Sequence, residues 1–403
     1  MSDFSDTQIN KKQEGGGNMK QASILIKPAS ANCNMDCRYC FYKCLSSNRQ
    51  EYSLGFMSEA TLELLVRNAI EYTDDYLTFA FQGGEPTLAG IDFFKKAIEL
   101  QKLYKKVKPS LRIENTIQTN ATTLTEEWCR FLHDENFLVG VSIDGPRKNH
   151  DFARKMSDGT DSFERVMTGI DLLKKYRVDF NILTVVTEQL STKASYLYKF
   201  YKRNGFEYVQ LIPCMDECGR QNIREGVEVS ENIYAVTPKS YGRFLSEFFD
   251  LWYEDFRNGD IMDVRMFSNL AQMTVGYPPE ECGMCGQCNC YFVVEGDGSV
   301  YPCDFYCMDE YRLGTVNDSF EELKKSQKAL NFENSSVQKS TKCIECKYYS
   351  LCRGGCRRFR KCDENITDVN YLCEGYKIFY EHTGERLKKL GQTIVNPAAR
   401  AFL

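Results

Sequence analysis

The sequence has few histidines and no long apolar run, and each shortage excludes a class of protein. Three histidines (His133, His150 and His382) occur among 403 residues, none near a run of cysteines, which disfavours Cys/His zinc sites and histidine-based catalysis. No apolar stretch approaches the roughly 20 residues that span a bilayer. The net charge of −5 disfavours binding to nucleic acid or anionic membranes, because such surfaces need clustered Lys and Arg. We therefore expect neither nucleic acid nor membrane as a partner.

The sequence is rich in cysteine, although a cytosolic protein rarely forms disulfides. The polar, Gly-rich start MSDFSDTQINKKQEGGGN lacks the apolar core of a secretory signal, so we interpret residues 1–20 as a disordered extension and expect a cytoplasmic protein. Nineteen cysteines in a reducing compartment then indicate metal binding. Sites built from thiolates alone suit iron–sulfur clusters or structural zinc.

Short β-rich runs alternate with amphipathic stretches from residue 22 to about 214. Near-continuous apolar strands that alternate with helices predict a parallel α/β sheet, either a partial barrel or a doubly wound sheet. Functional loops in such folds follow the carboxyl ends of the strands. The predicted strands are residues 22–28, 76–84, 111–120, 137–145, 179–187 and 208–213, and predicted helices include 58–72, 91–106, 126–136 and 162–176.

The last third of the chain has a different composition. A long helix over 238–257 leads into a segment rich in cysteine and turn residues, where YFVVEGDGSVYPC predicts a hairpin. A segment so rich in loops would need metal clusters, because metal binding there contributes folding free energy. We therefore divide the chain into a barrel over 21–235, a linking helical segment over 236–277, and a cysteine-rich domain with a C-terminal helix over 278–403.

Three cysteines crowd the loop after the first strand, in CNMDCRYCFY: Cys33, Cys37 and Cys40. Three thiolates on a cluster of four irons leave one iron without a protein ligand, and such an iron can bind and activate a small molecule. The alternative is a zinc loop completed by a distant residue, because structural zinc takes four ligands.

The loop after the second strand reads GGEP. Gly83 and Gly84 let the backbone approach a ligand, and a strand-end carbonyl together with the Glu85 carboxylate can receive an ammonium group. Taken alone, the same letters also suit a turn closed by a helix-capping acid.

The cysteine loop after the first strand, Phe41 beside its last cysteine, and GGEP after the next strand together resemble the radical S-adenosylmethionine (radical SAM) superfamily. The resemblance implies a partial (β/α)6 TIM-like barrel, a [4Fe-4S] cluster on the three cysteines, and SAM as a cosubstrate cleaved to a 5′-deoxyadenosyl radical. It assigns GGEP to the methionine amine. It also assigns Ser142 and Arg154 to the ribose or methionine end of SAM.

A second cysteine pattern follows in the last third of the chain and resembles the SPASM domain, which carries two fully ligated auxiliary [4Fe-4S] clusters. The resemblance implies three clusters in all, and two structural zinc ions are the alternative. Cys285 could replace Cys282 or Cys288 as a ligand. The implied ligand sets are Cys282, Cys288, Cys303 and Cys356 for one cluster, and Cys343, Cys346, Cys352 and Cys373 for the other.

The stretches YPCDFY, FAFQGGEPTLAG and IKPASANCNMDCRYCFY resemble the anaerobic sulfatase-maturating enzymes over nearly the whole chain after residue 20. That family oxidises a Cys or Ser in an unfolded or nascent sulfatase, within a Cys/Ser-x-Pro-x-Arg-like motif, to Cα-formylglycine. The resemblance makes Asp304 the general base that takes the thiol or hydroxyl proton after a Cβ hydrogen has been removed. Tyr42 and Gln82 flank the radical site, where we expect them to contact substrate or to pack at its rim.

We further expect flavodoxin or ferredoxin as the reductant and a monomeric protein. One alternative function is SPASM-type crosslinking of a ribosomal peptide, which we disfavour because only about 20 residues precede the first strand, too few for the recognition domain that such enzymes often carry. Another is an iron–sulfur electron carrier, which would have no use for GGEP. The sequence does not decide between Cys and Ser substrates.

Overall fold

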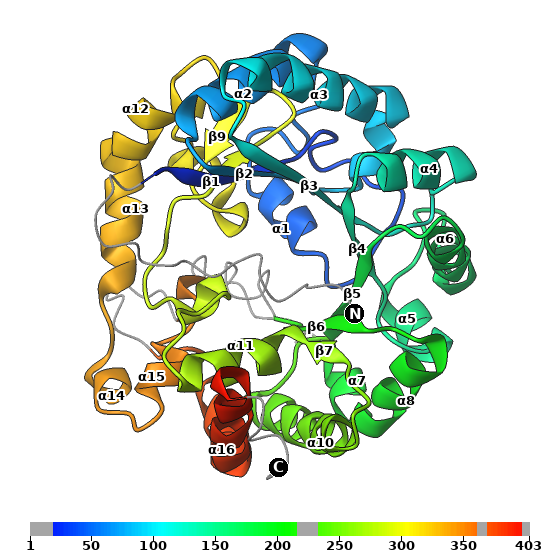
Figure 1. The fold of residues 1–403 in the computed structure, drawn as a ribbon, viewed down its shortest axis with the longest axis vertical. Helices are drawn as coiled ribbons and strands as arrows, with labels where there is room; N and C mark the ends of the chain where they lie inside the picture. Colours follow the sequence, from blue (N-terminus) through cyan, green and yellow to red (C-terminus); the bar gives the residue numbers. More distant parts are fainter. Residues whose placement is uncertain (1–18, 216–232, 361–368, 397–403) are drawn as a thin grey trace.

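The chain forms a curved parallel sheet with helices on its outer side (Figure 1). The computed structural model describes residues 19–215, 233–360 and 369–396, so nearly all of the extension predicted over 1–20 lies outside the described residues. Six parallel strands pair in chain order and confirm the predicted partial barrel: β1 (Gln21–Ile26), β2 (Tyr76–Phe81), β3 (Arg112–Thr119), β4 (Leu138–Ser142), β5 (Phe180–Val186) and β6 (Tyr208–Pro213).

Each strand buries alternate side chains against the outer helices, as the two-residue period of a strand requires. In β2, Leu77, Phe79 and Phe81 are fully buried, while the residues between them face the inside of the arc. Ser58 and Thr125 cap two of the outer helices by accepting backbone N–H groups. The helices of this part are α1 (Phe41–Ser47), α2 (Glu59–Tyr72), α3 (Ile91–Tyr104), α4 (Glu126–Asp134), α5 (Arg147–Ala153), α6 (Phe163–Lys175), α7 (Glu188–Ser191) and α8 (Ala194–Asn204).

The predicted hairpin of the C-terminal part is present, and it extends the barrel sheet. Strands β8 (Phe292–Val294) and β9 (Ser299–Tyr301) are antiparallel, and β8 also runs parallel to β1. The complete sheet has the order β10-β9-β8-β1-β2-β3-β4-β5-β6-β7, with β7 (Asp263–Val264) and β10 (Gly314–Thr315) at its edges. The carboxyl ends of β1 and β8 therefore lie side by side.

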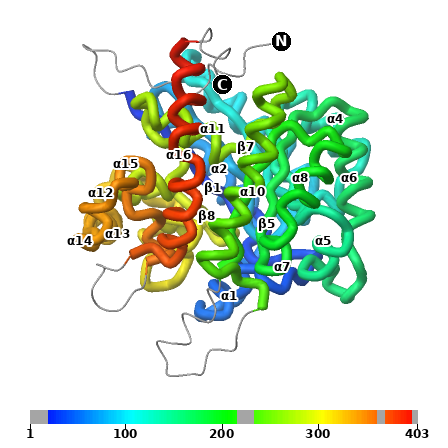
Figure 2. Tube along the Cα trace, turned by 90° about the horizontal axis from the view of Figure 1, so that it is seen from below, coloured from blue at the N-terminus to red at the C-terminus, as the bar shows by residue number. Residues whose placement is uncertain are grey.

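The predicted long helix and C-terminal helix pack against each other. Figure 2 shows α10 (Pro238–Arg257) and α16 (Cys373–Val395) running next to α11 (Arg265–Thr274). A Cβ atom on Gly242 or on Gly375 would overlap the backbone of the other segment, so glycine at both positions allows the close contact. This seam attaches the end of the chain to the barrel.

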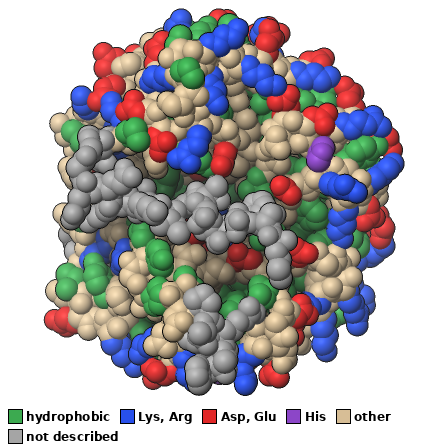
Figure 3. Space-filling view, in the orientation of Figure 1, with side chains coloured by type: hydrophobic (Ala, Val, Ile, Leu, Met, Phe, Trp, Pro, Cys, Tyr) green, Lys and Arg blue, Asp and Glu red, His purple; other side chains and the backbone are tan. Residues whose placement is uncertain are grey.

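The barrel part also has the 3-10 turns η1 (Pro86–Ala89) and η2 (Lys105–Val107). The C-terminal part has the short helices α12 (Phe320–Lys325), α13 (Gln327–Val337), α14 (Thr341–Ile344) and α15 (Tyr349–Cys352), and the 3-10 turns η3 (Cys282–Met284), η4 (Asp304–Tyr306), η5 (Asp309–Tyr311) and η6 (Arg357–Phe359). On the face drawn in Figure 3, basic and acidic side chains are intermixed, so neither sign of charge gathers into one patch. Among the described helices, none has both the length and the apolar character needed to cross a bilayer.

Candidate active site

The loops that the sequence marked as functional meet at the carboxyl ends of β1 to β4. The backbone N–H of Gln82 donates to the carbonyl of Ile26 at 2.8 Å, which continues the β1–β2 pairing beyond the strands. After β3, the side-chain amide of Asn120 donates to Asn34 Oδ1 at 2.8 Å, inside the three-cysteine loop. The loops following β1, β2 and β3 therefore form one connected surface.

Cys33, Cys37 and Cys40 lie together in this surface, and their thiols interact electrostatically with one another. Burial raises the pKa of the Cys33 thiol to about 11 and that of Cys37 to about 12. At neutral pH the metal-free thiols of Cys33 and Cys37 are therefore protonated, and binding iron must release their protons. Three sulfur donors in one loop, with a guanidinium nitrogen of Arg154 at 3.9 Å from Cys37 Sγ, fit a cluster that takes three thiolates.

The glycines of GGEP permit a close approach between the loops that follow β1 and β2. The backbone N–H of Gly84 donates to the carbonyl of Ser30 and that of Glu85 to the carbonyl of Asn32, each at 2.8 Å. A Cβ atom on Gly84 would overlap the carbonyl of Asn32. Gly83 has a φ of 114°, which favours glycine. The GGEP glycines therefore position the backbone of the cysteine loop.

The Glu85 carboxylate is buried and fully engaged by protein donors. It accepts hydrogen bonds from the backbone N–H and hydroxyl of Thr87, the hydroxyl of Thr119 and the backbone N–H of Asn120. Burial raises its pKa above the ordinary value although these donors oppose the shift. Because a carboxylate offers about four acceptor positions, an ammonium group would have to displace one of these donors or use nearby backbone carbonyls. The expected contact of this carboxylate with an amine stays a prediction, and the structure gives Glu85 a helix-capping role.

Arg154 is held beside the cysteine loop by an acid that sequence reasoning missed. Its Nε donates to Asp144 Oδ2 at 3.0 Å, and the hydroxyl of Tyr39 donates to the same oxygen. The guanidinium of Arg154 lies 5.4 Å from the ring centroid of Tyr39. Ser142 is the last residue of β4, two residues before Asp144 in the sequence, and its side chain is buried. Asp144 therefore orients the arginine, which leaves its second terminal nitrogen for another anion.

Asp304 comes to this edge from the C-terminal part of the chain. The hydroxyl of Tyr42 donates to Asp304 Oδ2 at 2.6 Å, and Lys27 Nζ lies 2.9 Å from Asp304 Oδ1 in an ion pair. Burial, followed by the Asp304 charge, raises the pKa of Tyr42 well above its ordinary value, so the phenol keeps its proton. Gln82 is half-buried at the end of β2. The carboxylate of Asp304 therefore contacts the phenol of Tyr42, two residues after Cys40 in the three-cysteine loop.

The C-terminal thiols interact electrostatically within two separate groups. Cys303 interacts with Cys356 and Cys282, and Cys356 also interacts with Cys288. The second group contains Cys343, Cys346, Cys352 and Cys373. The two groups contain the same residues as the two ligand sets expected from the sequence, and their ligation of four-iron clusters stays a prediction.

Cys285, the competing ligand, is exposed like Cys282, but the two thiols have different neighbours. Its thiol approaches the carbonyls of Pro279 and Glu281, at 3.9 and 3.6 Å. It interacts electrostatically with Cys288, whereas Cys282 also interacts with Cys303 and Cys356. The choice of Cys282 over Cys285 as the ligand stays a prediction.

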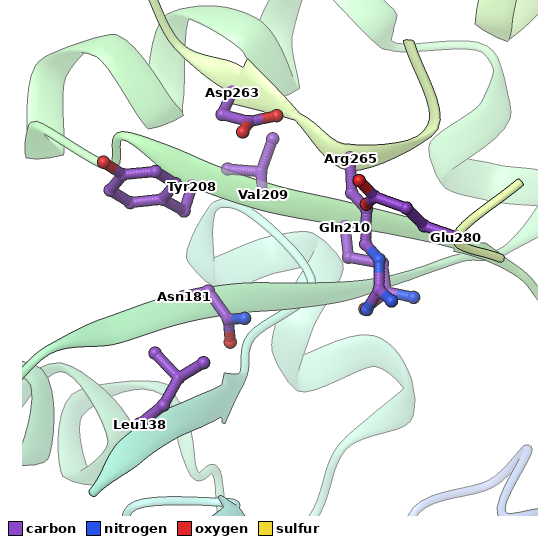
Figure 4. Close-up of a pocket in the computed structure, with 8 residues that line it drawn as sticks. All are labelled: Leu138, Asn181, Tyr208, Val209, Gln210, Asp263, Arg265 and Glu280. Atoms are coloured by element: carbon purple, nitrogen blue, oxygen red, sulfur yellow. The ribbon is translucent and has the colours of Figure 1, made fainter. Parts of the chain in front are cut away.

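A cavity of about 290 Å³ lies near the amino ends of β4 to β7, at the other end of the strands from the three-cysteine loop (Figure 4). It includes none of the predicted site residues. Its lining residues are Leu138, Asn181, Tyr208, Val209, Gln210, Asp263, Arg265 and Glu280.

Comparison with known proteins decides the family. A model of the radical SAM superfamily matches residues 28–191. A cysteine-type anaerobic sulfatase-maturating enzyme of Clostridium perfringens is 43% identical over 382 residues, which cover 93% of this chain and 100% of that protein. The chain belongs to the anaerobic sulfatase-maturating enzymes. It is therefore a radical SAM enzyme.

Further members of the family agree with this assignment. A serine-type anaerobic sulfatase-maturating enzyme of Bacteroides thetaiotaomicron is 34% identical, over 95% of this chain and 94% of that protein. The solved structure of native anSMEcpe with bound AdoMet and Cp18Cys peptide superimposes with a TM-score of 0.86 at 41% identity, over 93% of this chain and 100% of that one. The fold of this anaerobic sulfatase-maturating enzyme is thus that of a solved family member.

Sequence reasoning missed three side chains around Asp304 and Arg154: Lys27, Asp144 and Cys307. A lysine at the end of an apolar strand, directly before proline in SILIKP, was the available signal for Lys27. Among the described cysteines outside the expected ligand sets, all but Cys285 are buried, whereas Cys218 and Cys362 lie outside the described residues. The buried ones are Cys44, Cys129, Cys214, Cys290 and Cys307.

Proposed function

We propose that this chain oxidises a cysteine of a sulfatase polypeptide to Cα-formylglycine. Family membership supports the reaction, and the contact between Tyr42 and Asp304 beside the three-thiol loop is the observation that carries it. The preference for cysteine over serine is supported by the higher identity to cysteine-type relatives, 43% against 34%. The polypeptide would present a Cys-x-Pro-x-Arg-like segment.

We assign one [4Fe-4S] cluster to Cys33, Cys37 and Cys40, with SAM held by the GGEP loop, Ser142 and Arg154. Two auxiliary clusters would occupy the C-terminal thiol sets. Bound there, these groups would supply a 5′-deoxyadenosyl radical that removes one Cβ hydrogen atom and an acceptor for the second electron.

The chain's own residues then handle the proton and the geometry. Asp304 takes the thiol proton of the substrate, since its side chain is 16% exposed and so open to a ligand on one side. Loss of one hydrogen atom, one proton and one electron turns the Cβ–S single bond into a thioaldehyde, and water replaces sulfur to give the aldehyde and hydrogen sulfide. Tyr42 holds the carboxylate, and Gln82 faces the substrate from the end of β2.

We also propose the division into a radical SAM part over 21–235, a linking segment over 236–277 and a SPASM part over 278–403. Flavodoxin or ferredoxin would reduce the protein, which would act as a monomer. All-thiolate clusters need reducing conditions, which supports a cytoplasmic location.

The test is anaerobic incubation of the reconstituted protein with SAM, dithionite and a synthetic peptide that contains Cys-x-Pro-x-Arg, followed by mass spectrometry. We expect a mass loss of about 18 Da, because oxygen replaces sulfur and two hydrogens are lost, together with one 5′-deoxyadenosine per product. A peptide with serine in place of the cysteine should react more slowly. Deoxyadenosine without a modified peptide would reject the proposed function and leave a radical SAM enzyme with another substrate.

A further inference from the structure

Lys27 is a buried cation with a carboxylate on either side of it. Its side chain is 1% exposed, and its Nζ lies 2.9 Å from Asp304 Oδ1, 3.3 Å from Glu295 Oε1 and 3.4 Å from Cys307 Sγ. The ammonium donates a hydrogen bond to Cys307 Sγ and forms ion pairs with the two carboxylates. Asp304 Oδ1 is buried and receives no other hydrogen bond, so the ion pair with Lys27 is its polar contact. A lysine buried this deeply persists because its charge is compensated.

The backbone and stem of Lys27 are held as firmly as its charged end. Its N–H donates to the carbonyl of Val294 at 2.8 Å, which extends the β1–β8 pairing by one residue. A Cβ atom on Gly83 would lie 3.1 Å from Cβ and Cγ of Lys27, so the lysine stem packs against this glycine. Nζ also lies 4.5 Å from the ring centroid of Tyr42. Lys27 therefore has little freedom to move away from Asp304.

The formal charges of Lys27 and Arg49 balance those of Asp304 and Glu295. Arg49 Nη2 lies 2.7 Å from Glu295 Oε1, so two cations face two carboxylates, with Glu295 itself 1% exposed. Although burial lowers the pKa of the Lys27 ammonium, Asp304, Cys307 and Glu295 raise it above its usual value. Burial likewise raises the pKa of Glu295, but Lys27 and Arg49 hold it below its usual value. Lys27 and Glu295 are therefore both ionised at neutral pH.

We propose that Lys27 is a positioning residue that holds Asp304 Oδ1 while Tyr42 holds Oδ2, so that the carboxylate presents its exposed side to the substrate thiol. Lys27 is too buried to touch the substrate itself. The ammonium contributes an anchor from β1 for a carboxylate that belongs to the C-terminal part of the chain. This inference rests on the proposed function, because it assumes that Asp304 receives the proton.

The test measures formylglycine and 5′-deoxyadenosine in the same reactions with the reconstituted holoenzyme. In Lys27→Met the stem is kept and the charge is lost. We expect deoxyadenosine formation to continue while formylglycine per deoxyadenosine falls about tenfold to a hundredfold, as for a misplaced catalytic group. Peptide KM should stay close to that of the parent protein, and Lys27→Arg, which keeps the charge, should recover part of the coupling.

Two further variants separate positioning from simple folding effects. Lys27→Met leaves Glu295 and Asp304 facing Arg49 alone, whereas Lys27→Met with Glu295→Gln restores charge balance without restoring the contact to Asp304. The double variant should fold and bind iron like the parent and should still be uncoupled. Lys102→Met, on an exposed lysine that pairs with Glu135, is the control and should behave like the parent.

The outcomes are distinct. Full coupling in the double variant, or a raised peptide KM with unchanged turnover in Lys27→Met, would overturn the positioning role. Failure of the parent protein itself to make formylglycine would instead reject the proposed function.

Discussion

Replacing Gly84 by alanine should separate the GGEP loop from the three-cysteine loop. The added Cβ atom would overlap the carbonyl of Asn32, which is backbone and cannot rotate away. Clearing this overlap requires the two loops to part by about an ångström, because interiors are close-packed. The same movement stretches the hydrogen bonds from Gly84 to Ser30 and from Glu85 to Asn32.

The magnitude follows from these contacts. Overpacking of this kind costs about 1–3 kcal/mol, and each weakened backbone hydrogen bond costs about 0.5–1.5 kcal/mol. The free energy of unfolding should therefore fall by about 2–6 kcal/mol. Because the displaced segment carries Cys33, we also expect deoxyadenosine formation to fall about a hundredfold in protein that still binds iron.

Anaerobic denaturant unfolding of the reconstituted protein measures the first effect, and deoxyadenosine release from the same protein measures the second. Gly384→Ala is the matched control: this glycine lies inside α16 with open space around its Cα, so alanine should stabilise the helix by about 0.5–1 kcal/mol. A Gly84→Ala protein with the unfolding midpoint and the deoxyadenosine yield of the parent would refute the packing argument.

Three further predictions concern individual side chains. Asp304→Asn should keep deoxyadenosine formation and lower formylglycine at least about a hundredfold, whereas Cys37→Ala should abolish both; equal formylglycine from Asp304→Asn would refute its role as the base. Cys282→Ala should lose about four irons per chain by colorimetric analysis and Cys285→Ala none, and the reverse pattern would exchange the two ligands. Arg154→Met should weaken SAM binding at least about tenfold in equilibrium dialysis if its free nitrogen holds the SAM carboxylate, and unchanged binding would confine Arg154 to its contacts with Asp144 and Cys37.

Most helices and strands of this fold could be predicted because each is encoded by residues that are close together in the sequence. All six strands follow from short, β-rich apolar runs, and the helices over α2, α3, α4, α6 and α10 follow from apolar residues at three- and four-residue spacing. Strands β7 and β10 have two residues each, too few for a periodic signal. The hairpin was predicted, but its pairing with β1 was not, because nearly 270 residues separate Ile24 from its partner Phe292.

The part of the site that could be predicted is the part encoded by the spacing of cysteines along the sequence. The thiol sets could be taken from cysteine intervals and a family resemblance, and the structure groups them in the same way. Buried charge partners gave no such signal: Asp144 and Arg154 are ten residues apart, and Lys27 and Asp304 meet across the chain. Glu85 shows what a motif leaves out: GGEP suggested a ligand contact, which stays a prediction, but not the hydrogen bonds that its carboxylate accepts from Thr87, Thr119 and Asn120.

The pairing of β1 with β8 explains how two distant parts of the sequence can share one site. Lys27 directly follows β1 and Glu295 directly follows β8, and the N–H of Lys27 donates to Val294 between them. A shift of β8 by one residue would turn every side chain of this strand to the opposite face and remove Glu295 from Lys27. The thiol loop and the loop of Asp304 therefore depend on the same strand register. Side chains on either loop can be changed separately, but the distance between the radical site and the base is set by the backbone of one sheet.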